Sequence, residues 1–134
     1  MIVVDASAAI EVLLRTRLAK AIERRLLDPH EALHAPHLID LEIAHVLRRH
    51  CAARKLTEQE AREALAVFLG LPVERHPHEP FLHRIWELRH NLTAYDAAYI
   101  ALAEALHAPL VTCDRALASA AGHRARVELI AERR

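Results

Sequence analysis

Glycine is scarce in this chain, and its scarcity excludes the common nucleotide-binding motifs. The 134 residues include two glycines, Gly70 and Gly122. A dinucleotide-binding fingerprint needs three glycines and a P-loop needs two close together, so neither motif is present in its usual form. The nucleophile-elbow pattern G-x-S-x-G is also absent, and serine is limited to Ser7 and Ser119. Most common nucleotide-binding and serine-hydrolase chemistries are therefore excluded.

Cysteine pairs, long apolar runs and net charge are missing as well. Cys51 and Cys113 form no CxxC pair, which disfavours a disulfide framework or a cysteine-ligated zinc site. The longest run without a charged residue, 64–73, is too short for a membrane span of about 20 residues. The N-terminus lacks a basic segment, and Asp5 and Glu11 interrupt its apolar run, so we expect a cytoplasmic protein without a signal peptide. The 18 basic and 18 acidic residues cancel, so net charge alone does not attract nucleic acid.

The remaining composition predicts one folded α/β domain covering residues 1–134. A chain of this length with 53% hydrophobic residues can fill a core. Short apolar segments alternate with helical patterns, which is typical of a sandwich around a mostly parallel sheet. The expected strands are 2–4, 32–34, 71–75, 109–112 and 126–130. The expected helices are 8–14, 17–27, 37–53, 57–70, 80–90, 94–107 and 114–122.

Four carboxylates stand at the ends or starts of these elements. Asp5 ends the first strand, Asp114 follows the strand 109–112, Asp96 lies in the first turn of an apolar helix, and Glu42 lies on the long helix. Function in such sheets sits at the carboxyl ends of the strands, so we expect the four acids to meet there. A cluster of this kind cannot stay fully ionised without cations, and oxygen-only ligation suits Mg²⁺ or Mn²⁺.

Each acid also has a purely structural interpretation. Asp114 is able to cap the helix that follows it, and Asp96 is placed to complete a T-x-x-D capping box from Thr93. Asp5 is in position to cap the first helix, although Ser7 is the better cap there. The hypothesis of a site therefore depends on the four acids together and not on any one of them.

Glu42 alone would be assigned to the solvent-facing side of its helix. Its neighbours on the same face, His45 and Arg49, are polar. A place for Glu42 in the acidic cluster follows only if the helix turns this face towards the sheet edge.

Four segments of the chain resemble the motifs of PIN-domain ribonucleases, and among these the VapC-type toxins of toxin–antitoxin pairs. The segments are VVDASA, PHLIDLEIAHVLRR, LTAYDAAYIALA and LVTCDRAL. The resemblance covers nearly the whole chain and implies a PIN-like three-layer sandwich with Asp5, Glu42, Asp96 and Asp114 as catalytic, metal-binding acids. It also implies a supporting role for Ser7 and Thr112. One position departs from the family pattern, because His45 stands where Asn is common.

The resemblance implies a metal-dependent endoribonuclease, with Mg²⁺ or Mn²⁺ as cofactor, that leaves a 5′-phosphate and a 3′-hydroxyl on RNA. It further implies a homodimer inhibited by a small antitoxin. The chemistry fits the residues, since two ions held by carboxylates both activate a water molecule and neutralise the charge that develops during phosphodiester hydrolysis. The alternatives are a non-catalytic PIN-like module that binds RNA or protein, and a glycosidase that uses two of the carboxylates.

Other polar and aromatic groups favour structural roles. The histidines nearest in sequence, His30, His34 and His37 or His76 and His78, lack the helical spacing of a metal site, so we expect solvated or capping rings. Five aromatic residues are few for a base-stacking platform, and helix-core packing is favoured over base stacking for Tyr95 and Tyr99. The basic pairs would either line an RNA path or form solvated helix faces. They are Arg15/Arg17, Arg24/Arg25 and Arg48/Arg49.

Overall fold

A five-stranded parallel sheet forms the centre of the computed structural model, which describes residues 1–132. Its strands are β1 (Ile2–Val4), β2 (Leu33–Pro36), β3 (Val73–His76), β4 (Leu110–Thr112) and β5 (Val127–Leu129). They pair in the order β3-β2-β1-β4-β5, and every pair is parallel. The expected α/β sandwich with a mostly parallel central sheet is confirmed.

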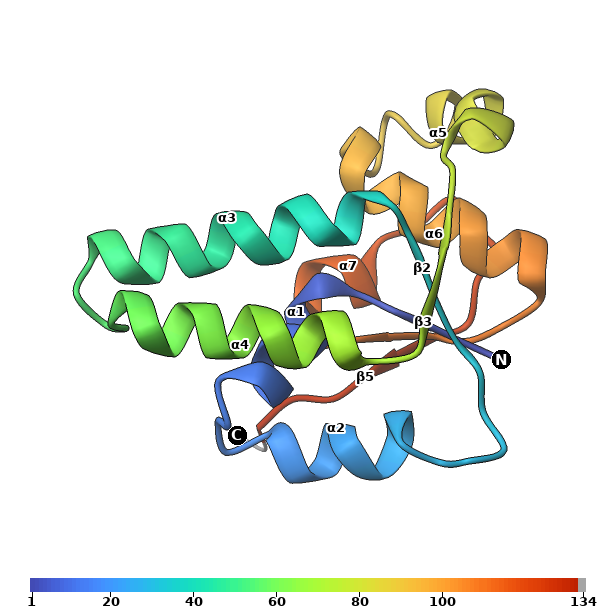
Figure 1. Cartoon of the computed structure of the whole chain (residues 1–134). Coiled ribbons are helices and arrows are strands. Elements are labelled where there is room, and N and C mark those ends of the chain that lie inside the picture. The colour runs from blue at the N-terminus through green and yellow to red at the C-terminus, as the bar shows by residue number, and fades with distance from the viewer. Residues whose placement is uncertain (133–134) are drawn as a thin grey trace.

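Helices cover both faces of this sheet (Figure 1). They are α1 (Ala6–Leu13), α2 (Ala19–Leu26), α3 (Leu38–Ala52), α4 (Glu58–Gly70), α5 (Leu82–Glu87), α6 (Ala94–Leu106) and α7 (Arg115–Ser119), with a 3-10 turn η1 (Glu79–Phe81) before α5. Helix α6 packs on β1, β2 and β4, and α5 packs against α6. Side chains of α1, α2 and α4 meet those of β1, β2 and β3 on the other face. Helices α3 and α4 run side by side as a hairpin. With helices on both faces, the sheet is the middle of three layers.

The strand order creates a natural place for a site. From β1 the chain moves outward to β2 and β3 on one side, and it later returns to place β4 and β5 on the other side. In open α/β sheets ligands bind at the carboxyl edge where the strand order reverses, and the corresponding crevice position here is between β1 and β4. Asp5 follows β1 and Asp114 lies two residues after β4, so both border this position.

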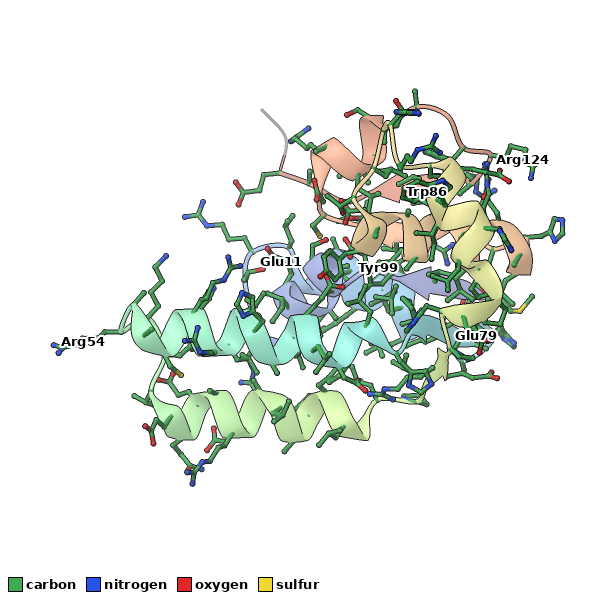
Figure 2. All side chains as sticks on the ribbon, turned by 90° about the horizontal axis from the view of Figure 1, so that it is seen from above. Glu11, Arg54, Glu79, Trp86, Tyr99 and Arg124 are labelled. Atoms are coloured by element: carbon green, nitrogen blue, oxygen red, sulfur yellow. The ribbon has the colours of Figure 1, made fainter. Side chains whose placement is uncertain are left out.

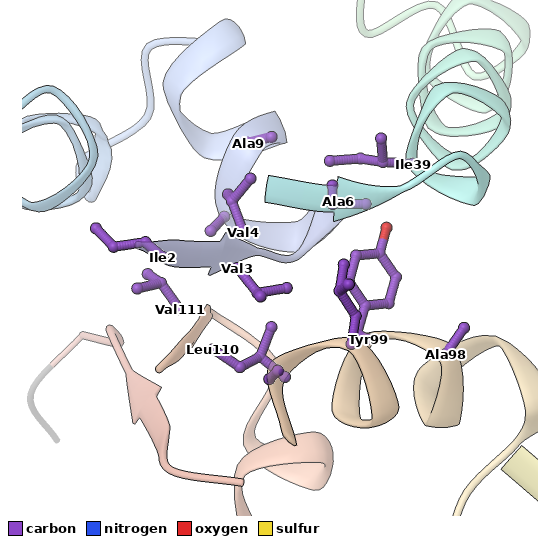
Figure 3. Packing of buried hydrophobic residues seen from close by; sticks show 14 of the residues in the cluster. Ile2, Val3, Val4, Ala6, Ala9, Ile39, Ala98, Tyr99, Leu110 and Val111 are labelled. Atoms are coloured by element: carbon purple, nitrogen blue, oxygen red, sulfur yellow. The ribbon is translucent and has the colours of Figure 1, made fainter. Parts of the chain in front are cut away.

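The core on both faces is built from β-branched, leucine and alanine side chains. Val3 and Val4 are both almost inaccessible to solvent, and because side chains alternate along a strand they point to opposite faces. Figure 3 shows Val4 directed towards Ala9 of α1, and Val3 towards Tyr99 and Leu110. In α6, seven consecutive residues from Ala97 to Ala103 are buried. Four of them are alanines, so this helix approaches the sheet closely and carries its N-terminal turn to the crevice.

Some element boundaries differ from the sequence predictions. The strand expected at 32–34 continues to Pro36, because the amide of His37 donates to His76 O at 2.9 Å where proline has no N–H to offer. The helix expected at 80–90 is a 3-10 turn followed by the short α5. The expectation that Ser7 caps the first helix is wrong, because α1 begins at Ala6 and Ser7 lies inside it.

No helix within residues 1–132 combines the length and apolarity that a bilayer crossing requires.

The capping box at the start of α4 gives a test of the fold that leaves the crevice untouched. Thr57 Oγ1 accepts from Glu60 N at 3.1 Å, and Glu60 Oε1 accepts from Thr57 N at 3.0 Å. Thr57→Ala removes one of these bonds and is expected to cost about 1 kcal/mol, lowering the melting temperature by about 2–8 °C. Thr57→Ser keeps the hydroxyl and serves as the control in thermal unfolding. Equal melting temperatures for the two variants would contradict a stabilising role for the cap.

Candidate active site

Asp5 is the most buried of the four acids. Its residue is 6% exposed, and it occupies the N-cap position of α1 without any side-chain capping bond. Its Oδ2 instead accepts hydrogen bonds from Ser7 Oγ at 2.7 Å and from Thr112 Oγ1 at 2.6 Å. The capping interpretation of Asp5 therefore fails, and the carboxylate is aimed across the crevice by two hydroxyl groups.

The same two hydroxyls also fix the loop after β4. Ser7 Oγ accepts from the backbone N–H of Cys113 at 3.0 Å, and Thr112 Oγ1 accepts from that of Asp114 at 3.0 Å. Each hydroxyl has a single proton, which it donates to Asp5, so the 3.1 Å approach between the two oxygens is a close contact within the network. The acid after β1 and the acid after β4 are thus positioned by one set of hydrogen bonds.

Asp114 combines its place in the crevice with a capping role. Its Oδ1 accepts from Ala116 N at 2.8 Å and from Leu117 N at 3.2 Å, so it does cap α7. Capping uses one of the two carboxylate oxygens. Within residues 1–132, Oδ2 has no side-chain or backbone hydrogen bond and is available to a ligand.

Asp96 is presented by the first turn of α6. Thr93 Oγ1 caps this helix by accepting from Asp96 N at 3.2 Å, but the return bond from the Asp96 carboxylate to the Thr93 backbone is absent. The capping box expected from the T-x-x-D pattern is therefore only half formed. The carboxylate of Asp96 is half-buried, and burial raises its pKa more than the Thr93 hydroxyl beside it lowers it.

Glu42 reaches the same region from α3, where it is held by Tyr99. The Tyr99 hydroxyl donates to Glu42 Oε1 at 2.6 Å, and the Tyr99 ring is fully buried. Figure 3 shows this hydroxyl pointing away from α6 and towards the start of α3 near Ile39. Figure 2 shows Tyr99 near the middle of the molecule, whereas Arg54 marks the distal end of α3. Glu42 is half-buried, so the solvent-facing interpretation of this residue is wrong.

Burial and the charges of neighbouring acids raise the pKa values of Asp5, Glu42 and Asp96. Burial raises the pKa of Asp5, and the charge of Asp114 raises it further, while the Thr112 and Ser7 hydroxyls oppose both effects. Burial also raises the pKa of Glu42, and the charges of Asp5 and Asp96 add to this rise. For Asp96, burial is again the largest cause, followed by the charges of Asp5 and Asp114. The structure therefore brings the four predicted residues into one electrostatic cluster.

This donor set fits hydrated divalent cations. Desolvated carboxylates that repel one another are stabilised in the ionised form by a cation, and all four side chains offer only oxygen. Within residues 1–132, no three of these acids have oxygens mutually within 4.8 Å, since the one group that meets this distance is His34, Glu74 and His76. Mg²⁺ usually keeps several waters and uses one or two direct carboxylates, so a wider spacing suits it. Asp5, Glu42, Asp96 and Asp114 are the residues that would hold such ions.

Tyr99 is the residue of this site whose contribution the sequence did not indicate. Helix-core packing was favoured for it, and its ring is indeed in the core, but its hydroxyl also orients an acid. The available signal was its spacing, because Tyr99 follows Asp96 by three residues and so shares its helix face. Tyr95, in contrast, is 64% exposed.

The basic residues considered for RNA binding differ in how exposed they are. His45 is exposed on α3, one turn after Glu42. The side chains of Arg15, Arg17, Arg48 and Arg49 are exposed too. Arg25 instead holds Glu128 through bonds of 2.7 and 3.1 Å, with Glu31 at 3.3 Å. Arg25 therefore stabilises the fold and is not part of a free basic surface.

Comparison with known proteins agrees with this geometry. The PIN domain family matches residues 2–123. The chain belongs to the PIN-domain family. "Ribonuclease VapC12" of Mycobacterium tuberculosis is 44% identical over 131 residues, which cover 98% of this chain and 100% of that protein. "Ribonuclease VapC9" of the same species is 50% identical over 114 residues, covering 85% of this chain and 86% of that protein. Within the family, the chain is thus related to the VapC ribonucleases.

Solved structures of the same fold are more distant in sequence. PAE2754 from Pyrobaculum aerophilum superimposes with a TM-score of 0.69 at 24% identity, covering 94% of this chain and 81% of that one. VapBC2 from Rickettsia felis, bound to a DNA fragment from its promoter, gives 0.70 at 14% identity, with 96% and 98% covered. At these identities the likeness establishes the PIN fold.

The raised pKa values predict a pH-dependent stability difference between Asp96→Asn and wild type. The folded-state pKa of Asp96 lies above its ordinary value of 3.8, so the stability given by its protonated form is present below that value and lost as pH rises through the folded pKa. In EDTA, Asp96→Asn should therefore resist urea increasingly better than wild type as the pH is raised from about 4 to neutrality. Saturating Mn²⁺ should remove or reverse the difference. A pH-independent difference would contradict repulsion among the acids.

Proposed function

We propose that this chain is a single-domain, divalent-metal-dependent endoribonuclease that acts as the toxin of a VapBC-type pair. The observation that carries the proposal is the cluster of Asp5, Glu42, Asp96 and Asp114 at the carboxyl edge of a PIN-fold sheet, where burial and neighbouring charges raise the pKa values of Asp5, Glu42 and Asp96. Membership of the family and relatives named as ribonucleases support the same activity. The cofactor is Mg²⁺ or Mn²⁺.

Hydrolysis of a phosphodiester requires an activated water and compensation for the charge on the phosphate and on the leaving oxygen. When bound, divalent ions supply both. The chain's own part is to hold four carboxylates in place. Ser7 and Thr112 orient Asp5, Tyr99 orients Glu42, and capping of α7 orients Asp114. Because these hydrogen bonds already hold the carboxylates in position, binding a cation would not cost the entropy of ordering their side chains.

RNA is the substrate class that this arrangement suits. The net charge is zero, so attraction to the phosphate backbone comes from bound cations and from local basic residues. Exposed arginines on α3 (Arg48 and Arg49) and on the α1–α2 connection (Arg15 and Arg17) are free to bind phosphates. His45 is exposed on α3, one turn beyond Glu42.

The partner proposed for this site is a small antitoxin, bound to a homodimer in the cytoplasm. An antitoxin segment that places an arginine among the acids would neutralise them with its own charge, since arginine forms strong paired hydrogen bonds with carboxylates. Inhibition then follows because metal and arginine compete for the same oxygens.

Asp96→Asn is expected to abolish RNA cleavage while the fold is kept. Asparagine preserves the shape at the start of α6, where the capping bond uses the backbone N–H of residue 96, but removes the charge that holds a cation. The loss should be several kcal/mol in the transition state, or about 10²–10⁴ in rate. The measurement is cleavage of a fluorescent RNA oligonucleotide across a Mg²⁺ and Mn²⁺ titration, with melting curves recorded in parallel.

Asp28→Asn is the matched control, because Asp28 lies in an exposed turn where its Oδ1 accepts from His30 N. It should cleave like wild type. Full activity of Asp96→Asn would remove this residue from the site. If wild type cleaved no RNA at any metal concentration, the non-catalytic binding module would be favoured. Cleavage of glycosides would favour the glycosidase.

The toxin assignment predicts a wild-type protein that arrests growth when expressed alone and has twice the mass of one chain by light scattering. Co-expression with the product of a small adjacent reading frame should relieve the arrest and yield a complex. Asp96→Asn should lose toxicity yet still form the dimer. A monomeric, harmless wild-type protein would refute both the partner and the assembly.

A further inference from the structure

Three metal-ligating side chains meet on the outer strands of the sheet, apart from the four acids. The β2–β3 ladder pairs His34 with Glu74 and Pro36 with His76. Residues two apart on a strand share a face, so Glu74 and His76 project on the same side as the cross-strand partner His34. Their donor atoms all lie within 4.8 Å of one another. Strand register therefore builds a cluster that the spacing of these histidines along the sequence does not reveal.

The distances within the cluster match those between the ligands of one ion. His34 Nδ1 lies 2.8 Å from His76 Nε2 and 3.6 Å from Glu74 Oε2. Zinc–nitrogen bonds of 2.0–2.1 Å in tetrahedral geometry put neighbouring donor atoms about 3.3 Å apart. The two observed separations lie on either side of that value. Glu74 is exposed, so rotation of its side chain adjusts the third ligand without moving the backbone.

The ring of His34 is buried beside the other two ligands. The residue is 5% exposed, and burial lowers its pKa, which favours the neutral imidazole that metals bind. Its Nδ1 faces His76, while its Nε2 is buried without a hydrogen-bond partner in residues 1–132. The contact with His76 therefore satisfies only half of this ring. Nδ1 is therefore the ring nitrogen that would bind an ion in the cluster, and Nε2 would carry the ring proton on the opposite side.

We infer that His34, Glu74 and His76 form a second metal site, selective for a transition ion of the Zn²⁺ class over Mg²⁺. Two imidazoles and one carboxylate suit zinc, nickel or copper, whereas the four acids of the crevice offer only oxygen and suit Mg²⁺ or Mn²⁺. Three protein ligands leave one tetrahedral position for water, on the side of the exposed Glu74.

A bound ion would join the edge strand β3 to the interior strand β2. The hydrogen bond from His37 N to His76 O already ties the start of α3 to the end of β3. The site therefore lies directly before the helix that carries Glu42, and its occupancy stabilises that corner of the sheet. This role does not depend on the proposed ribonuclease activity.

The test is Zn²⁺ binding to the untagged, EDTA-treated full chain, measured by calorimetry, by thermal unfolding and by the visible spectrum of bound Co²⁺. Wild type should bind one equivalent of Zn²⁺ more tightly than any that the four acids bind, and melt at a higher temperature with it. His76→Gln and Glu74→Gln should each weaken binding by more than about tenfold, since even outer-shell changes at zinc sites cost 10–100-fold. Circular dichroism checks that each variant is folded. Glu74 is exposed, so its substitution tests the site even if His76→Gln unfolds.

Two controls assign the ion to this cluster. His78→Gln removes an exposed histidine two residues from His76 and should bind Zn²⁺ like wild type. Asp96→Asn, which alters the acid cluster, should also retain the Zn²⁺ equivalent. Absence of Zn²⁺ binding by wild type, equal binding by wild type, Glu74→Gln and His76→Gln, or loss of the ion in Asp96→Asn would each overturn the inference. Failure of RNA cleavage alone would leave these binding results unchanged.

Discussion

The candidate site depends on one constraint: a carboxylate has to be held in place although it is buried away from water. Asp5 follows directly from the innermost strand, and its burial opposes ionisation. The Ser7 and Thr112 hydroxyls offset part of that cost. Because the same hydroxyls accept from the backbone after β4, the bonds that solvate Asp5 also fix the position of Asp114. One solution to a desolvation problem thereby positions two of the four acids.

The other two acids arrive through packing rather than through hydrogen bonds to Asp5. The alanine-rich face of α6 lets this helix lie close against the sheet, and its first turn then brings Asp96 to the edge. Three residues further on, Tyr99 spans from α6 to Glu42 on α3. Replacing the small residues of α6 with larger ones would push the helix outward and move both groups, so the geometry of the site depends on the volume of residues that never touch a substrate.

The sequence was informative wherever one local pattern determines the outcome. Strand-ending aspartates, the capping box at Thr57 and the apolar strands needed no tertiary information, and the family resemblance indicated which four acids to consider as a site. The pairing of Tyr99 with Glu42 was not predictable, because 57 residues separate them and only the tertiary fold brings them together. The meeting of His34 and His76 depends on strand register, where a shift of one residue would turn one ring to the opposite face. The cap expected at Ser7 was misplaced, because helix boundaries are uncertain by one or two residues. The Ser7 hydroxyl bonds to Asp5 instead.

On the proposed assignments, the carboxyl edge of this sheet separates two kinds of metal chemistry by donor type. Zinc binds most protein ligands more tightly than Mg²⁺ or Mn²⁺ does, so an all-carboxylate site cannot exclude it by affinity alone. The site with two imidazoles binds zinc on better terms, because nitrogen ligands favour it and hydrated Mg²⁺ gains little from them. The donor atoms of each site, and not competition between the two sites, would therefore set which ion each prefers.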